Sequence, residues 1–158
     1  MKPKAIISAC LVGIPCRYDG KHAELNCRSY LTERFDLIAV CPECLGGLGI
    51  PRMPAEIRGE RVETETGQDV TDRFRSGAEQ TVEIAKRNGA RIAILKNKSP
   101  SCGVTRIYDG NFCGSLKKGV GVTTRLLQSE GILCVGEDQL ASEADVRALF
   151  DRAAQGKS

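Results

Sequence analysis

Residues 5–10 read Ala-Ile-Ile-Ser-Ala-Cys, a short apolar run that ends at a cysteine. Residues 36–41, Asp-Leu-Ile-Ala-Val-Cys, repeat this arrangement, and residues 91–95, Arg-Ile-Ala-Ile-Leu, precede a loop that contains Cys102. Short apolar runs bounded by turn residues are typical of buried strands. If the three strands are parallel in one sheet, their carboxyl ends lie along one edge, and the three cysteines meet in one crevice there.

Helical patterns alternate with these strands. The clearest helix opens at Asp69 and ends at Asn88-Gly89, and further helices are predicted over residues 122–130 and from Ser142 onward. A fourth strand is predicted over residues 132–135. This order predicts an α/β fold, a single-domain three-layer sandwich built on a mainly parallel, doubly wound (Rossmann-like) sheet.

Two irregular regions are predicted to form hairpins. Residues 57–66 alternate around turn residues, which predicts a small β-hairpin insertion. Asp109-Gly110 predicts a small hairpin turn between Ile107-Tyr108 and Phe112. We expect one domain over residues 1–158, with a core of about residues 4–154 and a polar tail at 155–158.

Composition narrows the class of protein. The chain has 158 residues and a formal net charge of +3, and it contains no Trp, 3 Tyr and 4 Phe, which argues against a nucleic-acid-binding surface. No apolar run is long enough for a signal peptide or a membrane span, so we expect a cytoplasmic protein without membrane association. The 8 cysteines, in a reducing compartment, then indicate metal binding or thiol chemistry.

The cysteines fall into two groups by position. Cys10, Cys41 and Cys102 follow predicted strands beside Gly or Pro residues, where a backbone can approach a ligand, and we expect them to bind a metal. All-sulfur ligation favours zinc, copper(I) or an iron–sulfur cluster, and three ligands leave one coordination position for substrate. Packing roles are expected for the three cysteines Cys27, Cys113 and Cys134, whereas Cys16 and Cys44 remain candidate ligands.

Cys41-Pro42-Glu43-Cys44 is a C-x-x-C pattern with two other interpretations. It could be half of a zinc knuckle, but no second C-x-x-C or His pair lies nearby, and His22 is the only histidine. It could also be a redox dithiol at a helix N-terminus, although that interpretation leaves Cys10 and Cys102 without a role.

Acids, hydroxyls and cations accompany these thiols. Glu43 is a candidate for proton transfer or, alternatively, a carboxylate that shapes a turn. Asp19 lies in a turn beside Arg17, and Ser99 and Ser101 flank Pro100 in the loop before Cys102. We expect the substrate to contact the side chains of Asp19, Arg52 and Ser99. Gly119 and Gly121 favour close packing of a helix more than a phosphate cradle.

Several ordered motifs resemble the bacterial thiouracil desulfurase family, over roughly residues 4–136. They are Ser8-Ala9-Cys10-Leu11-Val12-Gly13, Cys16-Arg17-Tyr18-Asp19-Gly20, Cys41-Pro42-Glu43, Leu45-Gly46-Gly47-Leu48, Pro51-Arg52-Met53-Pro54-Ala55-Glu56 and Lys96-Asn97-Lys98-Ser99-Pro100-Ser101-Cys102-Gly103. The resemblance implies a [4Fe-4S] cluster held by three cysteines, Cys10, Cys41 and Cys102. It also implies catalytic roles for Glu43 and Ser101. Cys44 departs from the family pattern, and its thiol could fill the open iron site.

The expected reaction is therefore a non-redox desulfuration of a thiolated pyrimidine, of the 2- or 4-thiouracil type, to the oxo base and hydrosulfide. Two alternatives remain open at this point: a non-catalytic zinc- or sulfur-binding module built on Cys41 and Cys44, and desulfuration of thiolated nucleotides or tRNA. The expected partners are a small thiolated pyrimidine and the iron–sulfur assembly machinery, and the expected oligomeric state is a monomer or weak homodimer.

Overall fold

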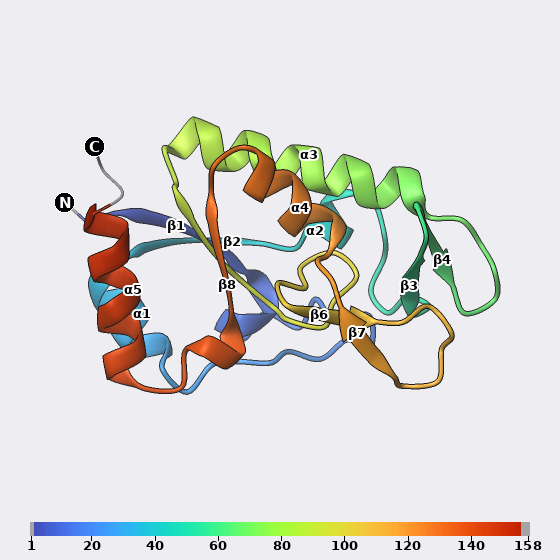
Figure 1. Cartoon of the computed structure of the whole chain (residues 1–158), viewed down its shortest axis with the longest axis horizontal. Coiled ribbons are helices and arrows are strands. Elements are labelled where there is room, and N and C mark those ends of the chain that lie inside the picture. Colours follow the sequence, from blue (N-terminus) through green and yellow to red (C-terminus); the bar gives the residue numbers. More distant parts are fainter. Residues whose placement is uncertain (1, 156–158) are drawn as a thin grey trace.

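A four-stranded parallel sheet forms the centre of the molecule. The computed structural model describes residues 2–155, and the predicted tail beyond residue 155 lies outside them. The strands are β1 (Lys4–Ser8), β2 (Asp36–Val40), β5 (Ile92–Leu95) and β8 (Leu133–Gly136). Their order is β2-β1-β5-β8, and every pairing is parallel (Figure 1). The chain thus builds outward from β1 in both directions, as the doubly wound prediction requires.

Helices cover both faces of the sheet, because each strand is apolar on both sides. On one face, Ile7 and Ile94 pack with buried residues of α1 (Arg28–Arg34) and α5 (Glu143–Gln155). On the other face, Ile6 and Leu95 pack with buried residues of α3 (Thr71–Asn88) and α4 (Val122–Ser129). These layers confirm the predicted α/β sandwich (Figure 1).

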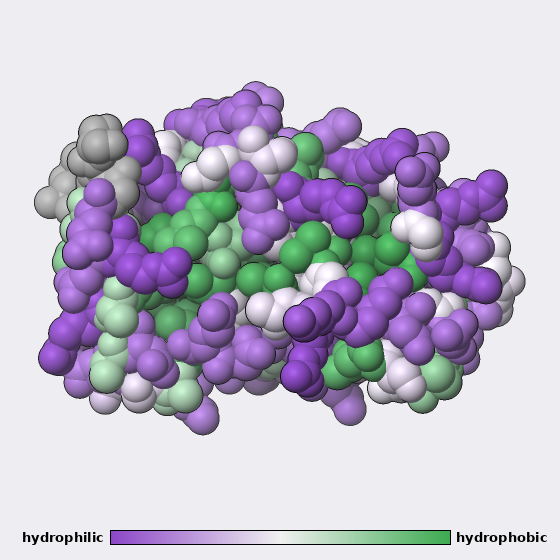
Figure 2. Space-filling model, in the orientation of Figure 1, coloured by the Kyte–Doolittle hydropathy of each residue, from purple (hydrophilic) through white to green (hydrophobic). Residues whose placement is uncertain are grey.

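The edge of the sheet at β8 carries no further strand among the described residues. Figure 2, in the orientation of Figure 1, shows a band of hydrophobic residues across the middle of the visible surface, with hydrophilic residues above and below it.

No helix within residues 2–155 is both long and apolar enough to cross a membrane.

Two antiparallel hairpins flank the carboxyl edge of the sheet. The first, β3 (Ala55–Arg58) with β4 (Arg61–Thr64), is the predicted insertion. The second pairs β6 (Arg106–Tyr108) with β7 (Leu116–Lys118). The hairpin predicted after Ile107-Tyr108 is thus confirmed, but its return strand is Leu116–Lys118, so the predicted tight turn to Phe112 is wrong. The backbone N–H groups of Gly110 and Phe112 donate to the Glu56 carboxylate instead of to a strand ladder.

Short helices follow three of the strands. The 3₁₀ helix η1 (Ala9–Val12) begins directly after β1, and α2 (Pro42–Leu45) begins one residue after β2. Pro42 occupies the first turn of α2, where a missing N–H costs nothing. A second 3₁₀ helix, η2 (Glu137–Gln139), follows β8.

The packing of α2 on α3 depends on two glycines. A Cβ atom added to Gly77 of α3 would overlap the carbonyl oxygen of Pro42, and one added to Gly46 would overlap the carbonyl oxygen of Arg73. The two backbones therefore touch directly. This contact fixes the position of α2, and with it the position of Cys41 at the N-cap of that helix.

We expect Gly77→Ala to lower the free energy of unfolding by about 1–3 kcal/mol, since overpacking a tight contact has a cost of this size. Helix propensity alone predicts the opposite sign, because Ala favours a helix over Gly by about 1 kcal/mol. Urea unfolding of the purified protein measures the difference. Glu79→Ala, at an exposed position of the same helix, is the matched control and is expected to change stability by less than about 0.5 kcal/mol. A Gly77→Ala protein as stable as the parent would contradict the contact.

Candidate functional site

A cavity of about 250 Å³ lies at the carboxyl edge of the sheet. It is lined by residues that follow β1, β2 and β5, together with parts of the loop before β3 and of the hairpin strands β3 and β6. The chain order reverses between β1 and β5, so the two loops that leave these strands turn in opposite directions and leave a crevice between them. Open α/β sheets bind their ligands at such a position.

The three predicted metal ligands all line this cavity. Cys10 lies in η1, Cys41 is the N-cap residue of α2, and Cys102 lies in the turn after β5. Cys10 and Cys102 are buried and Cys41 is partly buried. Three thiols from three separate segments therefore face one enclosed space.

Two further cysteines lie near these thiols and differ in position. Cys16 also lines the cavity, and its carbonyl oxygen lies 3.7 Å from the Cys41 sulfur and 4.0 Å from the Cys44 sulfur. Cys44 does not belong to the cavity lining and packs against the hydrophobic core.

The remaining cysteines lie apart from the cavity. Cys27 and Cys134 are buried, as expected for packing roles. Cys113 is exposed, which contradicts the packing role expected for it, because the longer β6–β7 loop carries it to the surface beside Asp109 and Ser115.

The surroundings of two cavity thiols, Cys16 and Cys102, raise their pKa values. Burial raises the pKa of Cys102 to about 12, and hydrogen bonds from the hydroxyls of Ser8 and Ser101 offset only part of that rise. A hydrogen bond with the Cys10 thiol is the largest cause that raises the pKa of Cys16 to about 11. Buried thiolates need a compensating positive charge, and bound metal supplies it.

The donor set fits a cluster better than a single ion. Among residues 2–155, no three His, Cys, Asp or Glu side chains are arranged to bind one metal ion. In an iron–sulfur cluster each cysteine binds a different iron, so the thiols need not converge on one point. The soft, all-sulfur donors around an enclosed cavity satisfy the chemical requirement for such a group.

Glu43 and Arg52 form an ion pair at the cavity wall. The Arg52 Nε donates to Glu43 Oε1 at 3.1 Å, and the two side chains are 8% and 17% exposed, respectively. Burial raises the pKa of Glu43, and Arg52 opposes that rise. The other Arg52 nitrogens donate to the carbonyl oxygens of Cys16 and Gly49, at 3.0 and 3.1 Å. Arg52 therefore ties three segments of the site together.

The two predicted serines differ in orientation. Ser99 lines the cavity, and its hydroxyl oxygen accepts hydrogen bonds from the backbone N–H groups of Ser101 and Cys102. The Ser101 hydroxyl lies 2.8 Å from the Thr123 hydroxyl in α4, is 1% exposed, and is not part of the lining. The structure thus presents Ser99, and not Ser101, to the cavity.

Asp19 also lies outside the lining. Its carboxylate accepts a hydrogen bond from the backbone N–H of Lys21 and pairs with Arg17 at 3.6 Å. These are the contacts of a turn-forming aspartate, whereas its neighbours Arg17 and Tyr18 line the cavity.

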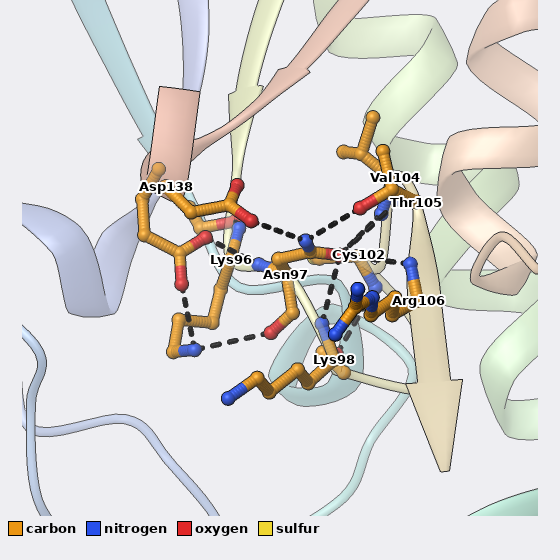
Figure 3. Close-up of polar contacts among 11 residues, drawn as sticks. Lys96, Asn97, Lys98, Cys102, Val104, Thr105, Arg106 and Asp138 are labelled. Atoms are coloured by element: carbon orange, nitrogen blue, oxygen red, sulfur yellow. Dashed lines mark hydrogen bonds and ion pairs between the residues drawn. The ribbon is translucent and has the colours of Figure 1, made fainter. Parts of the chain in front are cut away.

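Asn97, which the sequence analysis did not single out, anchors the loop that carries Ser99 and Cys102 (Figure 3). It is 2% exposed. Its Oδ1 accepts four backbone N–H bonds at 3.0–3.3 Å, from Lys98, Val104, Thr105 and Arg106. Its Nδ2 donates to Thr105 Oγ1 and Asp138 Oδ2. The sequence signal that could have identified this anchor is an Asn two residues after a buried strand.

The same loop is held from the other side by α4. Backbone N–H groups of Val122 and Thr123 donate to the carbonyl oxygens of Pro100 and Ser101. A Cβ on Gly121 would overlap the Ser101 carbonyl and lie 2.7 Å from the Cys102 nitrogen. The absence of a Cβ at Gly121 therefore permits the predicted close packing, here between the start of α4 and the Cys102 loop.

Comparison with known proteins adds independent evidence on this site. Residues 5–139 match the family described as 2-thiouracil desulfurase. An uncharacterized Bacillus subtilis (strain 168) protein, YbbK, is 40% identical over 145 residues, which cover 85% of this chain and 96% of that protein. A solved structure of the [4Fe-4S]-dependent thiouracil desulfidase TudS is 47% identical with a TM-score of 0.85, and the match covers 94% of this chain and 99% of that one. The match over nearly the whole length confirms the resemblance found in the motifs, and the chain belongs to the 2-thiouracil desulfurase family.

Proposed function

We propose that this protein is a [4Fe-4S]-dependent thiouracil desulfidase whose cluster is held by Cys10, Cys41 and Cys102. The observation that carries the proposal is the meeting of three thiols from three strand ends in one cavity. The similarity to TudS supports it, since the match extends over 94% of the chain at 47% identity.

The proposed reaction replaces sulfur by oxygen without net redox. A water oxygen bonds to the thiocarbonyl carbon, the carbon–sulfur bond breaks, and hydrosulfide leaves while the oxo base forms. When bound, a [4Fe-4S] cluster with three thiolate ligands supplies an iron free of protein ligands, a Lewis acid toward the thiocarbonyl sulfur.

Glu43 is the proposed general base. Its carboxylate lines the cavity and is largely shielded from solvent, where it can take a proton from the attacking water and return it to the departing sulfur. The Arg52 guanidinium holds one of its oxygens. Because Arg52 uses its nitrogens on Glu43, Cys16 and Gly49, we assign it a positioning role in place of the expected contact with substrate.

The two serines of the loop before Cys102 have different proposed roles. The side chain of Ser99 lines the cavity and is the proposed substrate contact. Ser101 acts on the loop: its hydroxyl binds Thr123, and its hydrogen bond to Cys102 lowers the pKa of that thiol. Asp19 shapes the turn that carries Arg17 and Tyr18 to the cavity wall.

The size of the cavity supports a small free base as substrate. A volume of about 250 Å³ lies just below the range of ligand pockets, which is roughly 300–1,000 Å³. The net charge of +3 offers little for a nucleic acid. All eight cysteines are free, which supports a reducing, cytoplasmic setting in which the iron–sulfur assembly machinery supplies the cluster.

The alternative of a zinc or sulfur module on the C-x-x-C pair finds less support. Cys44 is not part of the cavity lining, and no three donors among the described residues suit a single ion.

The decisive experiment for the proposed desulfidase activity is anaerobic incubation of the reconstituted protein with 2- or 4-thiouracil. Release of sulfide together with uracil is expected, and a protein loaded with its cluster that releases neither would refute the proposal.

We expect Cys102→Ala and Cys41→Ala to lose the cluster, because each removes one of three ligands. The parent should contain about four iron atoms and four acid-labile sulfides per chain. Iron and sulfide analysis, with the visible absorbance of the anaerobic protein, measures the loss. Cys44→Ala is the matched control, since it removes the other thiol of the same C-x-x-C pair. Retention of iron in Cys102→Ala, or zinc binding that depends on Cys44, would favour the module.

We expect Glu43→Gln to lower kcat by about 10²–10⁴-fold, the usual contribution of general acid–base catalysis. The amide keeps a hydrogen-bond acceptor for Arg52 but cannot take a proton. Single-turnover sulfide release measures the change, and the cluster absorbance verifies that the site is loaded. Full turnover by a loaded Glu43→Gln protein would exclude Glu43 as the base.

A further inference from the structure

A second carboxylate lines the cavity and has no part in the proposed mechanism. Glu56, in β3, is 8% exposed and forms part of the cavity wall. Glutamate is rarely buried to this extent unless it is paired with a cation or with hydrogen-bond donors. The hydrogen-bond donors to the Glu56 carboxylate therefore indicate the role of this side chain.

One oxygen of Glu56 is fully used by the protein. Oε1 accepts hydrogen bonds from the backbone N–H groups of Gly110 and Phe112, at 2.9 and 3.2 Å. Both donors lie in the β6–β7 loop in left-handed conformations, with φ of +95° and +54°. A Cβ on Gly110 would lie 2.8 Å from the Ile57 carbonyl oxygen. The loop is therefore wrapped closely around this single oxygen.

The other oxygen has no protein partner within residues 2–155. Both hydrogen bonds to the carboxylate end on Oε1, and Oε2 is not fully enclosed by protein atoms. Oε2 is thus accessible on a side chain that is otherwise buried and borders the cavity. A hydrogen-bond acceptor held at a cavity wall in this way is available to a ligand.

We propose that Glu56 is a specificity-determining residue whose free oxygen Oε2 accepts the N3–H of the thiolated pyrimidine. The inference rests on the proposed function and adds a recognition contact to it. In thiouracil N3 lies between C2 and C4, so its N–H adjoins the thiocarbonyl in both the 2-thio and the 4-thio isomer. A carboxylate is an acceptor only, and it therefore selects a ring that presents a donor at this position.

The geometry supplies a variant that separates recognition from folding. In Glu56→Gln the amide oxygen can replace Oε1 and keep both backbone hydrogen bonds, which places the amide NH₂ group toward the cavity. The opposite rotamer would set NH₂ against two N–H donors and is disfavoured. The substitution therefore preserves the loop anchor and turns the acceptor in the cavity into a donor.

The experiment compares the anaerobic, cluster-loaded parent with Glu56→Gln. Steady-state kinetics with 2-thiouracil and calorimetric binding of uracil are the two readouts, and cluster absorbance and the thermal midpoint verify the state of the protein. We expect KM for 2-thiouracil and Kd for uracil to rise by about 10- to 100-fold, the loss typical of a charged hydrogen bond, while kcat changes by less than about 3-fold.

Glu63→Gln is the matched control. Glu63 lies directly opposite Glu56 in the β3–β4 register, and it does not line the cavity. The same change of charge on the same hairpin should leave KM and Kd at the parent values.

A chemical probe tests the inference without a variant. The parent protein should bind N3-methyl-2-thiouracil at least about 10-fold more weakly than N1-methyl-2-thiouracil, because only the former lacks the N3 donor. Equal binding of the two methylated bases would overturn the proposal. Unchanged KM and Kd in Glu56→Gln, or loss of its cluster or fold, would also overturn it. In each of these cases sulfide release by the parent would leave the proposed function standing, whereas a parent that releases no sulfide would refute that function itself.

Discussion

Parallel pairing of β1 with both β2 and β5 is the constraint on which the rest of this molecule depends. It brings three chain segments, separated by as many as 92 residues between Cys10 and Cys102, to one edge of one sheet. Parallel strands require crossovers, and the helices of these crossovers cover both faces and leave the carboxyl edge open. The site is therefore enclosed at that edge by the loops that follow the strands.

The electrostatics of the cavity follow from this enclosure. Burial there raises the pKa of the Cys102 thiol to about 12. A group of sulfurs buried in this way is stable as neutral thiols or as ligands of a metal group, and it is poorly stable as free thiolates. The ion pair of Arg52 with Glu43 meets the same requirement differently, since each charge compensates the other and the Arg52 guanidinium also donates to backbone carbonyl oxygens.

Rigid supports in and around the cavity wall hold these groups in place. Asn97 binds four backbone N–H groups of the Cys102 loop, and the first turn of α4 binds carbonyl oxygens of the same loop. Direct backbone contact at Gly77 positions α2 and so Cys41. Sites formed on loops gain precision when neighbouring side chains and helix ends fix the loops in this way. The site of this protein is accordingly an assembly of anchored loops on a conventional sheet.

The sequence by itself determined the architecture and the edge of the sheet at which three cysteines meet. The apolar runs at residues 36–40 and 91–95 are strands because their composition allows little else, and parallel order then predicts that Cys10, Cys41 and Cys102 meet. Only the tertiary structure decided which polar side chains enter the cavity. Asp19 turns toward its own loop and the Ser101 hydroxyl toward Thr123, while Glu56 and Asn97 take central positions. Strand formation follows from local hydrophobicity, but the direction of a polar side chain depends on hydrogen-bond partners far away in the chain, and local sequence does not encode them.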